Sequence, residues 1–96
     1  ISPQQVEQTL RERVESVVEA VAERAADAGV DAVTAIEPGV PDDAIIEYAT
    51  ANDCDLVVMG THGRTGLERY LLGSVTERTV RRSTVPVLTV RGSDDD

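Results

Sequence analysis

The feature that most constrains the fold of this chain is a series of spaced glycines between two apolar segments. The segment Leu56–Met59 has the length and composition of a buried strand, and a second apolar segment, Val85–Val90, lies near the end of the chain. Between them stand glycines at positions 60, 63, 66 and 73. Because glycine lets the backbone approach another group closely, this part of the chain predicts a strand, a Gly-rich loop, a helix and a second strand.

The residues after the last glycine predict the start of that helix. Ser74 and Glu77 stand three positions apart, which is a capping-box signature and predicts a helix from about Val75. The start of a helix presents free N–H groups and the positive end of the helix dipole. With glycine amides beside it, such a start favours phosphate binding. The residues alone leave open the alternative that the glycines only form turns and that Ser74 only caps the helix.

Two common nucleotide-binding motifs are excluded by the spacing. The glycines are not followed by Gly-Lys-Ser or Gly-Lys-Thr, as a P-loop requires, and they do not form Gly-x-Gly-x-x-Gly, as in a dinucleotide-binding fold.

The length of 96 residues predicts one small domain, which we place at residues 1–91, with an acidic disordered tail at residues 92–96. The chain has no apolar run of about 18 residues, so a membrane span is not expected. A single cysteine, Cys54, cannot form an internal disulfide, which is typical of proteins of the reducing cytoplasm.

The charge of the chain is strongly negative. All nine basic residues are Arg, and 18 Asp and Glu residues oppose them, so the formal net charge is −9. An acidic surface repels nucleic-acid backbones and anionic lipids, so neither is an expected partner. The acidic, Lys-free composition favours a halophilic source, in which high salt screens the repulsion; a high-GC genome, which favours Arg over Lys, is the alternative explanation.

The first half of the chain predicts a long helix followed by a strand. Ser2, Pro3 and Gln5 form a helix start, and apolar residues at three- and four-residue spacing continue to Gly29, which predicts one amphipathic helix of about 25 residues. The segment Val30–Glu37 is rich in Val, Thr and Ile and predicts a strand.

A second helix is predicted from Pro41 to about Asn52, and Asp42 and Asp43 in its first turn are interpreted as partners of the helix dipole. Helices and strands therefore alternate along the chain, which predicts an α/β fold with a parallel sheet. Ligands of such folds bind beyond the carboxyl ends of the strands, where Gly60 is expected.

The spacing Gly60, two residues, Gly63, nine residues, Gly73-Ser74 resembles the ATP-binding motif of the universal stress protein family. The surrounding M-G-T-H-G-R-T-G and L-L-G-S-V-T-E are also similar to that family. The resemblance implies a Rossmann-like fold of the adenine nucleotide α-hydrolase type, with a parallel sheet and helices on both faces. It covers the last two-thirds of the domain, so the first strand–helix–strand portion has no counterpart in this sequence.

The resemblance also implies a ligand, ATP with Mg²⁺, held on its phosphate side. The implied binding residues are Met59, Gly60, His62, Gly63, Arg64, Gly73, Ser74, Val75 and Thr76. The family's residues for adenine, ribose and metal follow strands that have no counterpart here, so no catalytic residue and no metal ligand is assigned to this chain.

The last strand, Val87–Val90, resembles the family's dimerisation strand, which implies a homodimer. Three functions remain open from the sequence: a cytoplasmic regulatory module that binds ATP, a dimerisation module that does not bind nucleotide, and a weak ATP hydrolase. Phosphoryl transfer needs a positioned nucleophile and charge stabilisation besides a phosphate site, and the sequence shows only the phosphate site.

Overall fold

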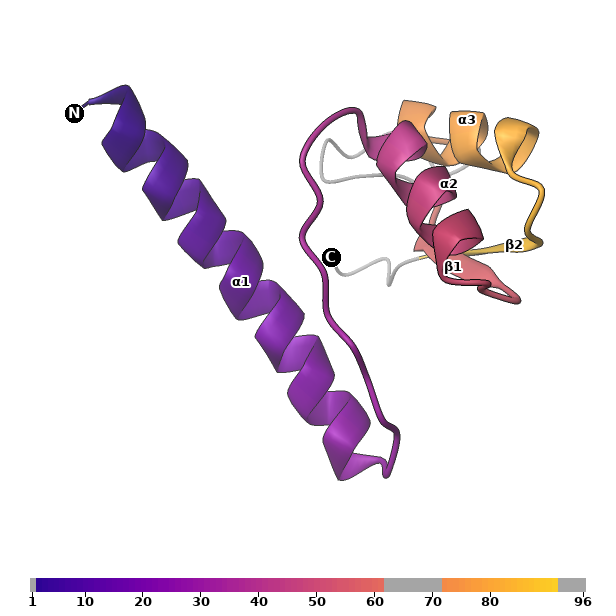
Figure 1. The fold of residues 1–96 in the computed structure, drawn as a ribbon, viewed down its shortest axis with the longest axis horizontal. Coiled ribbons are helices and arrows are strands. Elements are labelled where there is room, and N and C mark those ends of the chain that lie inside the picture. The colour runs from indigo at the N-terminus through magenta and orange to yellow at the C-terminus, as the bar shows by residue number, and fades with distance from the viewer. Residues whose placement is uncertain (1, 62–71, 92–96) are drawn as a thin grey trace. The chain divides into compact units, whose positions relative to one another are not determined.

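The computed structural model describes residues 2–61 and 72–91, in the order α1, α2, β1, α3, β2 (Figure 1). The chain forms two compact units, Ile1–Glu37 and Pro38–Asp96. The first contains one helix. In its described residues, the second contains two helices and a parallel pair of strands.

Helix α1, Pro3–Asp27, begins and ends where the sequence predicts. The Ser2 hydroxyl accepts a hydrogen bond from the Gln5 amide at 3.2 Å, and the Ser2 amide donates to Gln5 Oε1 at 2.9 Å, so the capping box is complete. At the other end Gly29 has φ +76°, and the Val30 amide donates to the Ala25 carbonyl at 2.8 Å. This Schellman motif needs a left-handed residue, which glycine adopts without steric strain.

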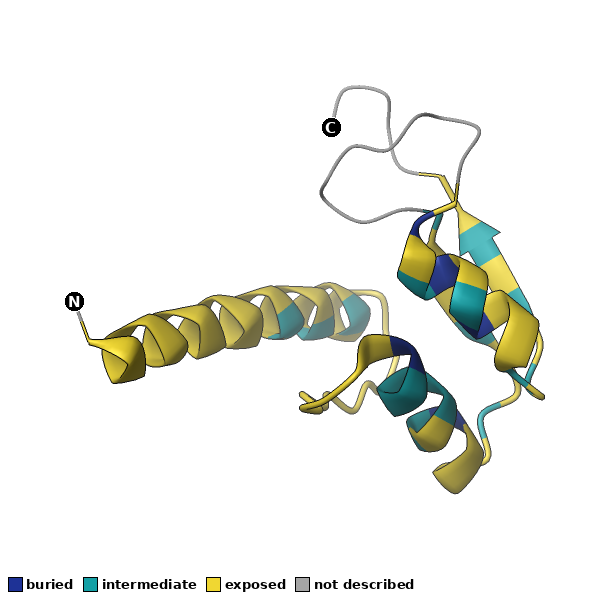
Figure 2. Ribbon diagram, turned by 90° about the horizontal axis from the view of Figure 1, so that it is seen from above, coloured by how far each residue is buried: buried dark blue, intermediate teal, exposed yellow. Residues whose placement is uncertain are grey.

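No residue of α1, all of which are described, is buried, and Figure 2 shows the helix as largely exposed. The predicted apolar stripe is present but exposed, with between 44% and 59% of each residue accessible at Val6, Leu10, Val14, Val17 and Val21. The helix is therefore defined in this unit by its end signals and its length rather than by burial.

The predicted strand Val30–Glu37 is wrong, because the structure has no strand between residues 30 and 38. A strand is stabilised by hydrogen bonds to a neighbouring strand. Among the described residues, the sheet has two strands, β1 and β2, and they pair with each other. Although the segment is rich in β-branched residues, it has no neighbouring strand in the described sheet with which to form hydrogen bonds.

Helix α2, Pro41–Ala51, has Pro41 as its first residue, as the sequence predicts. Its C-cap is Asn52, and the following residue, Asp53, has φ +50°. The Cys54 amide donates to the Ala49 carbonyl at 2.9 Å, so α2 also ends in a Schellman motif, with Asp53 in the left-handed position that Gly29 takes after α1.

Strands β1, Val57–Gly60, and β2, Val87–Val90, are parallel, with Val57 opposite Val87 and Gly60 opposite Val90. This confirms the α/β class and the parallel sheet. Burial alternates along both strands: Val57, Met59, Val87 and Thr89 are half-buried, whereas the other face carries the exposed side chains of Val58, Leu88 and Val90. Helices α2 and α3 contact each other, and α3 contacts β2, so within this unit the described helices cover one face of the sheet (Figure 1).

Helix α3, Ser74–Arg82, begins one residue earlier than predicted, and its predicted capping box is wrong. The N-cap is Gly73, whose ψ of 156° is extended, and the Ser74 side chain makes no capping hydrogen bond. Because an N-cap residue must have extended backbone angles and Ser74 is already helical, Ser74 is the first residue of the helix instead.

Most fully buried side chains in the described part of the chain are polar. Asp42, Thr76 and Thr79 are at most 4% exposed, and Ala49 is 3% exposed. Figure 2 shows the buried residues on α2 and α3. Buried polar groups are stable only with hydrogen-bond partners, and these partners define the candidate site and its support.

Candidate functional site

Two hydrogen bonds bring the carboxyl end of β1 to the start of α3, and a third joins it to the end of β2. The Thr76 hydroxyl donates to the Gly60 carbonyl at 2.7 Å, and the Gly73 amide donates to the Thr61 carbonyl at 2.8 Å. The Thr61 amide donates to the Val90 carbonyl at 2.9 Å, which extends the parallel ladder by one bond. The end of both strands and the first turn of α3 therefore form one connected site, where α/β folds bind ligands.

The first turn of α3 supplies the donors of this site. The Glu77 amide donates to the Gly73 carbonyl at 2.9 Å, which is the first bond of the helix. The amides of Ser74, Val75 and Thr76 precede that bond and so have no intrahelical acceptor. Ser74 is exposed, whereas Gly73 is buried. The helix start can therefore offer amides and the positive end of its dipole to an anion.

Six of the predicted binding residues lie in this connected region: Met59, Gly60, Gly73, Ser74, Val75 and Thr76. The other three, His62, Gly63 and Arg64, lie outside the described residues. The structure adds a distinction within the set, because the Thr76 hydroxyl proton is used by the Gly60 carbonyl. Thr76 thus ties α3 to β1, and its amide is the group that remains for a ligand.

Thr61 is a member of the site that the sequence analysis missed. Its backbone bonds to both β2 and Gly73, yet its hydroxyl is buried and has no hydrogen-bond partner among residues 2–61 and 72–91. A buried hydroxyl without a partner is uncommon in folded proteins, and a ligand oxygen at this point would satisfy it. The signal was its place directly after Gly60 in the M-G-T-H-G segment.

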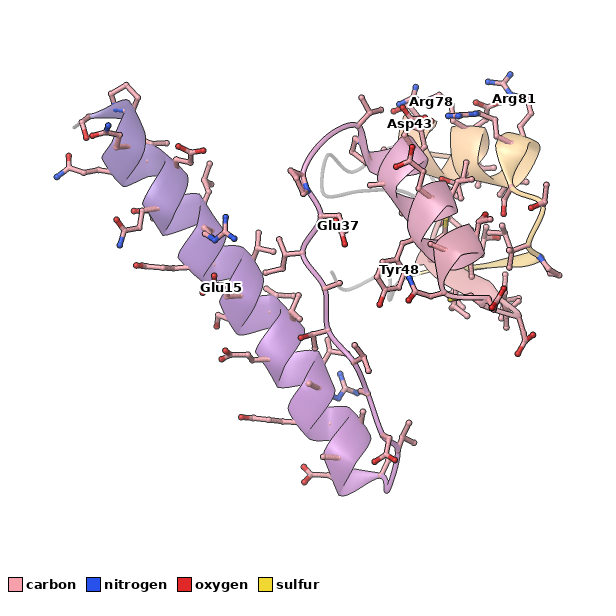
Figure 3. All side chains as sticks on the ribbon, viewed as in Figure 1. Glu15, Glu37, Asp43, Tyr48, Arg78 and Arg81 are labelled. Atoms are coloured by element: carbon pink, nitrogen blue, oxygen red, sulfur yellow. The ribbon has the colours of Figure 1, made fainter. Side chains whose placement is uncertain are left out.

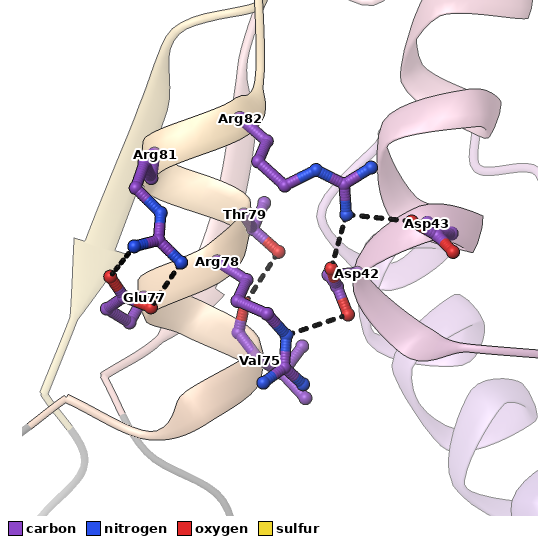
Figure 4. Close-up of polar contacts among 8 residues, drawn as sticks. All are labelled: Asp42, Asp43, Val75, Glu77, Arg78, Thr79, Arg81 and Arg82. Atoms are coloured by element: carbon purple, nitrogen blue, oxygen red, sulfur yellow. Dashed lines mark hydrogen bonds and ion pairs between the residues drawn. The ribbon is translucent and has the colours of Figure 1, made fainter.

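Asp42 supports α3 from the side of α2 (Figure 4). Its carboxylate accepts from Arg78 Nε at 3.2 Å and from an Arg82 guanidinium nitrogen at 2.6 Å, and Arg82 also donates to Asp43 at 2.7 Å. Figure 3 shows Arg78 and Asp43 where the start of α2 meets α3. Asp42 therefore does more than complement the helix dipole, because its carboxylate joins two helices that are distant in the sequence.

Two opposing effects act on the pKa of the Asp42 carboxyl. Burial acts to raise this pKa, but the hydrogen bonds from Arg78, the backbone and Arg82, together with the positive charge of Arg78, outweigh it and hold the pKa below its ordinary value. Hydrogen bonds and charge from Asp43 and Asp42 likewise raise the pKa of Arg82. The ion pair is thus charged at neutral pH.

No helix in residues 2–61 and 72–91 is long and apolar enough to cross a membrane. Nor do the His, Cys, Asp and Glu side chains of these two ranges gather in a group of three or more that could hold a metal ion.

Comparison with known proteins decides the family. Residues 2–91 match the family model described as the Universal stress protein family. The chain belongs to the universal stress protein family. This confirms the resemblance drawn from the glycine spacing.

Two curated relatives come from Methanocaldococcus jannaschii. Universal stress protein MJ0531 is 42% identical over 86 residues, covering 90% of this chain and 51% of that protein. Universal stress protein MJ0577 is 40% identical over 65 residues, covering 68% of this chain and 40% of that protein. The chain spans about half the length, or less, of these two universal stress proteins.

The solved structures share the fold. The structure of MJ0577 superposes with a TM-score of 0.87 at 32% identity, and that of PH0823 with a TM-score of 0.74 at 26% identity. Each superposition covers 95% of this chain and 64% of the other. The Rossmann-like α/β fold expected of a universal stress protein is therefore confirmed.

Proposed function

We propose that this universal stress protein binds ATP at the start of α3 and acts as a nucleotide-responsive regulatory module of the stress response. One observation carries the proposal: hydrogen bonds from the Thr76 hydroxyl to the Gly60 carbonyl and from the Gly73 amide to the Thr61 carbonyl bring the first amides of α3 to the carboxyl end of β1. The G-2x-G-9x-G-S spacing supports it.

The chemistry of the site fits a phosphate group. The amides of Ser74 and Val75 and the buried hydroxyl of Thr61 can donate to phosphate oxygens, and the helix dipole favours negative charge there. By sequence, Gly63 adds an amide and His62 and Arg64 add side chains from the intervening loop. Mg²⁺ would enter the site on the phosphate oxygens of ATP.

We propose that the site binds ATP rather than hydrolyses it. The Glu77 carboxylate in the first turn of α3 is paired with Arg81. The other groups at the start of α3 are amides and hydroxyls, which hold a phosphate without activating a nucleophile. A weak ATP hydrolase is the alternative, and phosphate release that is clearly above background and is lost in Arg64→Ala would favour it.

Calorimetric titration of the chain with MgATP in molar salt tests the proposal. We expect saturable binding that is weakened more than about tenfold by Gly73→Leu, because a side chain at this buried N-cap would displace either the ligand or the first turn of α3. Ala51→Leu, at an exposed position in the last turn of α2, is the matched control and should bind as the parent does. Equal affinity in a folded Gly73→Leu variant would rule out this site.

We also propose that the universal stress protein forms a homodimer through the edge of β2. Among the described strands, β1 pairs with one edge of β2 and nothing pairs with the other, while Leu88 and Val90 are 50% and 48% exposed. Leu88→Lys should convert the dimer to monomer in sedimentation velocity, whereas Val80→Lys on the exposed side of α3 should not. A dimer whose sedimentation does not change when ATP is added would favour the alternative function, a dimerisation module that does not bind nucleotide.

The compartment that we propose is the cytoplasm of a halophile. The lone Cys54 and the net charge of −9 support it. Thermal unfolding with increasing KCl tests the halophilic part: stability that does not rise with salt would contradict it.

A further inference from the structure

Asp42 is a charged residue that is almost completely buried. It is 1% exposed, and both oxygens of its carboxylate accept hydrogen bonds from α3. The donors, Arg78 and Arg82, are 36 and 40 residues away in the sequence. The Asp42 carboxylate is not one of the groups proposed to bind phosphate, so its burial needs a different explanation.

Helix α3 depends on such contacts for its placement. It has only nine residues, four of which are β-branched, and its N-cap makes no side-chain hydrogen bond. Isolated helices of this length are unstable in water, and β-branched residues weaken them further. The orientation of α3 is therefore determined by what holds it from outside.

Besides its packing against α2 and β2, two sets of hydrogen bonds join α3 to other elements. At the start, Thr76 bonds to the Gly60 carbonyl and Gly73 bonds to the Thr61 carbonyl. From the middle to the end, Arg78 and Arg82 bond to the Asp42 carboxylate. The second set fixes α3 at points remote from its N-terminal end, in addition to the packing of α3 against α2 and β2.

A buried carboxylate is a poor source of stability, because an apolar pair of similar volume is often as favourable. The carboxylate instead fixes the orientation of α3 relative to α2, because each of its oxygens accepts a hydrogen bond from a different arginine. We propose that Asp42 is a positioning residue of the nucleotide site: by holding Arg78 and Arg82 it sets the axis of α3 and so directs the amides of residues 74–76 at the phosphate. This inference rests on the proposed function.

The test compares Asp42→Asn with Asp43→Asn. Asp43→Asn is the matched control, because the Asp43 side chain is 46% exposed and, among the described residues, its carboxylate pairs only with Arg82. Well below the unfolding midpoint, we expect Asp42→Asn to weaken MgATP binding about tenfold and Asp43→Asn to leave it within about twofold. Equal affinities for the parent and a folded Asp42→Asn variant would overturn the inference.

Amide hydrogen exchange gives a second readout that does not need nucleotide. In Asp42→Asn, the exchange of the Gly73 and Glu77 amides should rise about tenfold relative to that of Val57, whose amide bonds to Pro86 in the sheet. If Asp42 only stabilised the fold, the exchange rates of the Gly73, Glu77 and Val57 amides would rise together, and this result would contradict the proposal. If Asp42→Asn does not fold, Arg82→Gln, which leaves Arg78 in place, provides the same comparison.

The two experiments separate the two proposals. If the parent protein does not bind MgATP, the proposed function fails, whereas the exchange pattern still decides whether Asp42 orients the start of α3. If the parent binds and Asp42→Asn binds equally well, the function stands and the positioning role is wrong.

Discussion

Helices α1 and α3 differ in what makes them helical. α1 has 25 residues, a complete capping box at Ser2 and a glycine in the left-handed position after its end, and none of its residues is buried. α3 has nine residues and no side-chain cap, yet Thr76 and Thr79 are buried in it. The comparison teaches that local signals suffice for the long helix, whereas the short helix at the phosphate site exists because other elements hold it.

The largest expected effect that separates the two helices is at Asp42. Asp42→Ala removes the acceptor of two charge-assisted hydrogen bonds from α3, and such bonds are stronger than bonds between neutral groups. We expect the unfolding midpoint of the unit that contains α3 to fall by roughly 10 °C. Differential scanning calorimetry measures this, and an unchanged midpoint would show that α3 does not depend on the ion pair.

A smaller effect is expected at Thr76. Thr76→Val keeps the shape but leaves the Gly60 carbonyl without its donor, which should lower the free energy of unfolding by about 1–2 kcal/mol. Urea denaturation measures the difference. Thr50→Val, at an exposed position on α2, is the control and should change stability much less. Equal losses in the two variants would mean that the hydrogen bond from Thr76 to β1 makes no contribution of its own to stability.

The cap of α1 gives the reverse contrast. Ser2→Ala removes the acceptor of the Gln5 amide, and loss of an N-cap costs about 1 kcal/mol of helix stability. We expect a loss of ellipticity from fraying of the first turn, with α3 unaffected. Gln8→Ala, which removes only an exposed hydrogen bond to Glu12, should keep the ellipticity. The interpretation of α1 as a locally determined helix fails if the two variants behave alike.

The smallest effect concerns the ends of the two Schellman motifs. Asp53 has φ +50°, a conformation that strains an L side chain, so Asp53→Gly should stabilise its unit by about 0.5 kcal/mol. Gly29→Asp, the reciprocal change after α1, should weaken that end by a similar amount. Chemical denaturation of both variants measures the pair, and a loss of stability in Asp53→Gly would show that the Asp53 side chain has a stabilising contact of its own.

The sequence by itself determined the features that depend on neighbours a few residues apart. The cap at Ser2, the start of α2 at Pro41 and the end of α1 at Gly29 are as predicted, because caps and turn residues act through their own backbone. The glycine spacing was also sufficient to indicate the family, and the apolar runs after residues 55 and 84 were sufficient to indicate both strands of the sheet.

Other features were decided by the tertiary structure. The segment Val30–Glu37 has the composition of a strand but no partner in the described sheet, and Ser74 has the spacing of a cap but lies inside the helix. Asp42 was predicted to serve only the dipole of its own helix, yet it is buried against Arg78 and Arg82. Each outcome depends on groups that are distant in the sequence, and the interactions that a strand or a buried carboxylate requires become available only when the chain has brought those groups together.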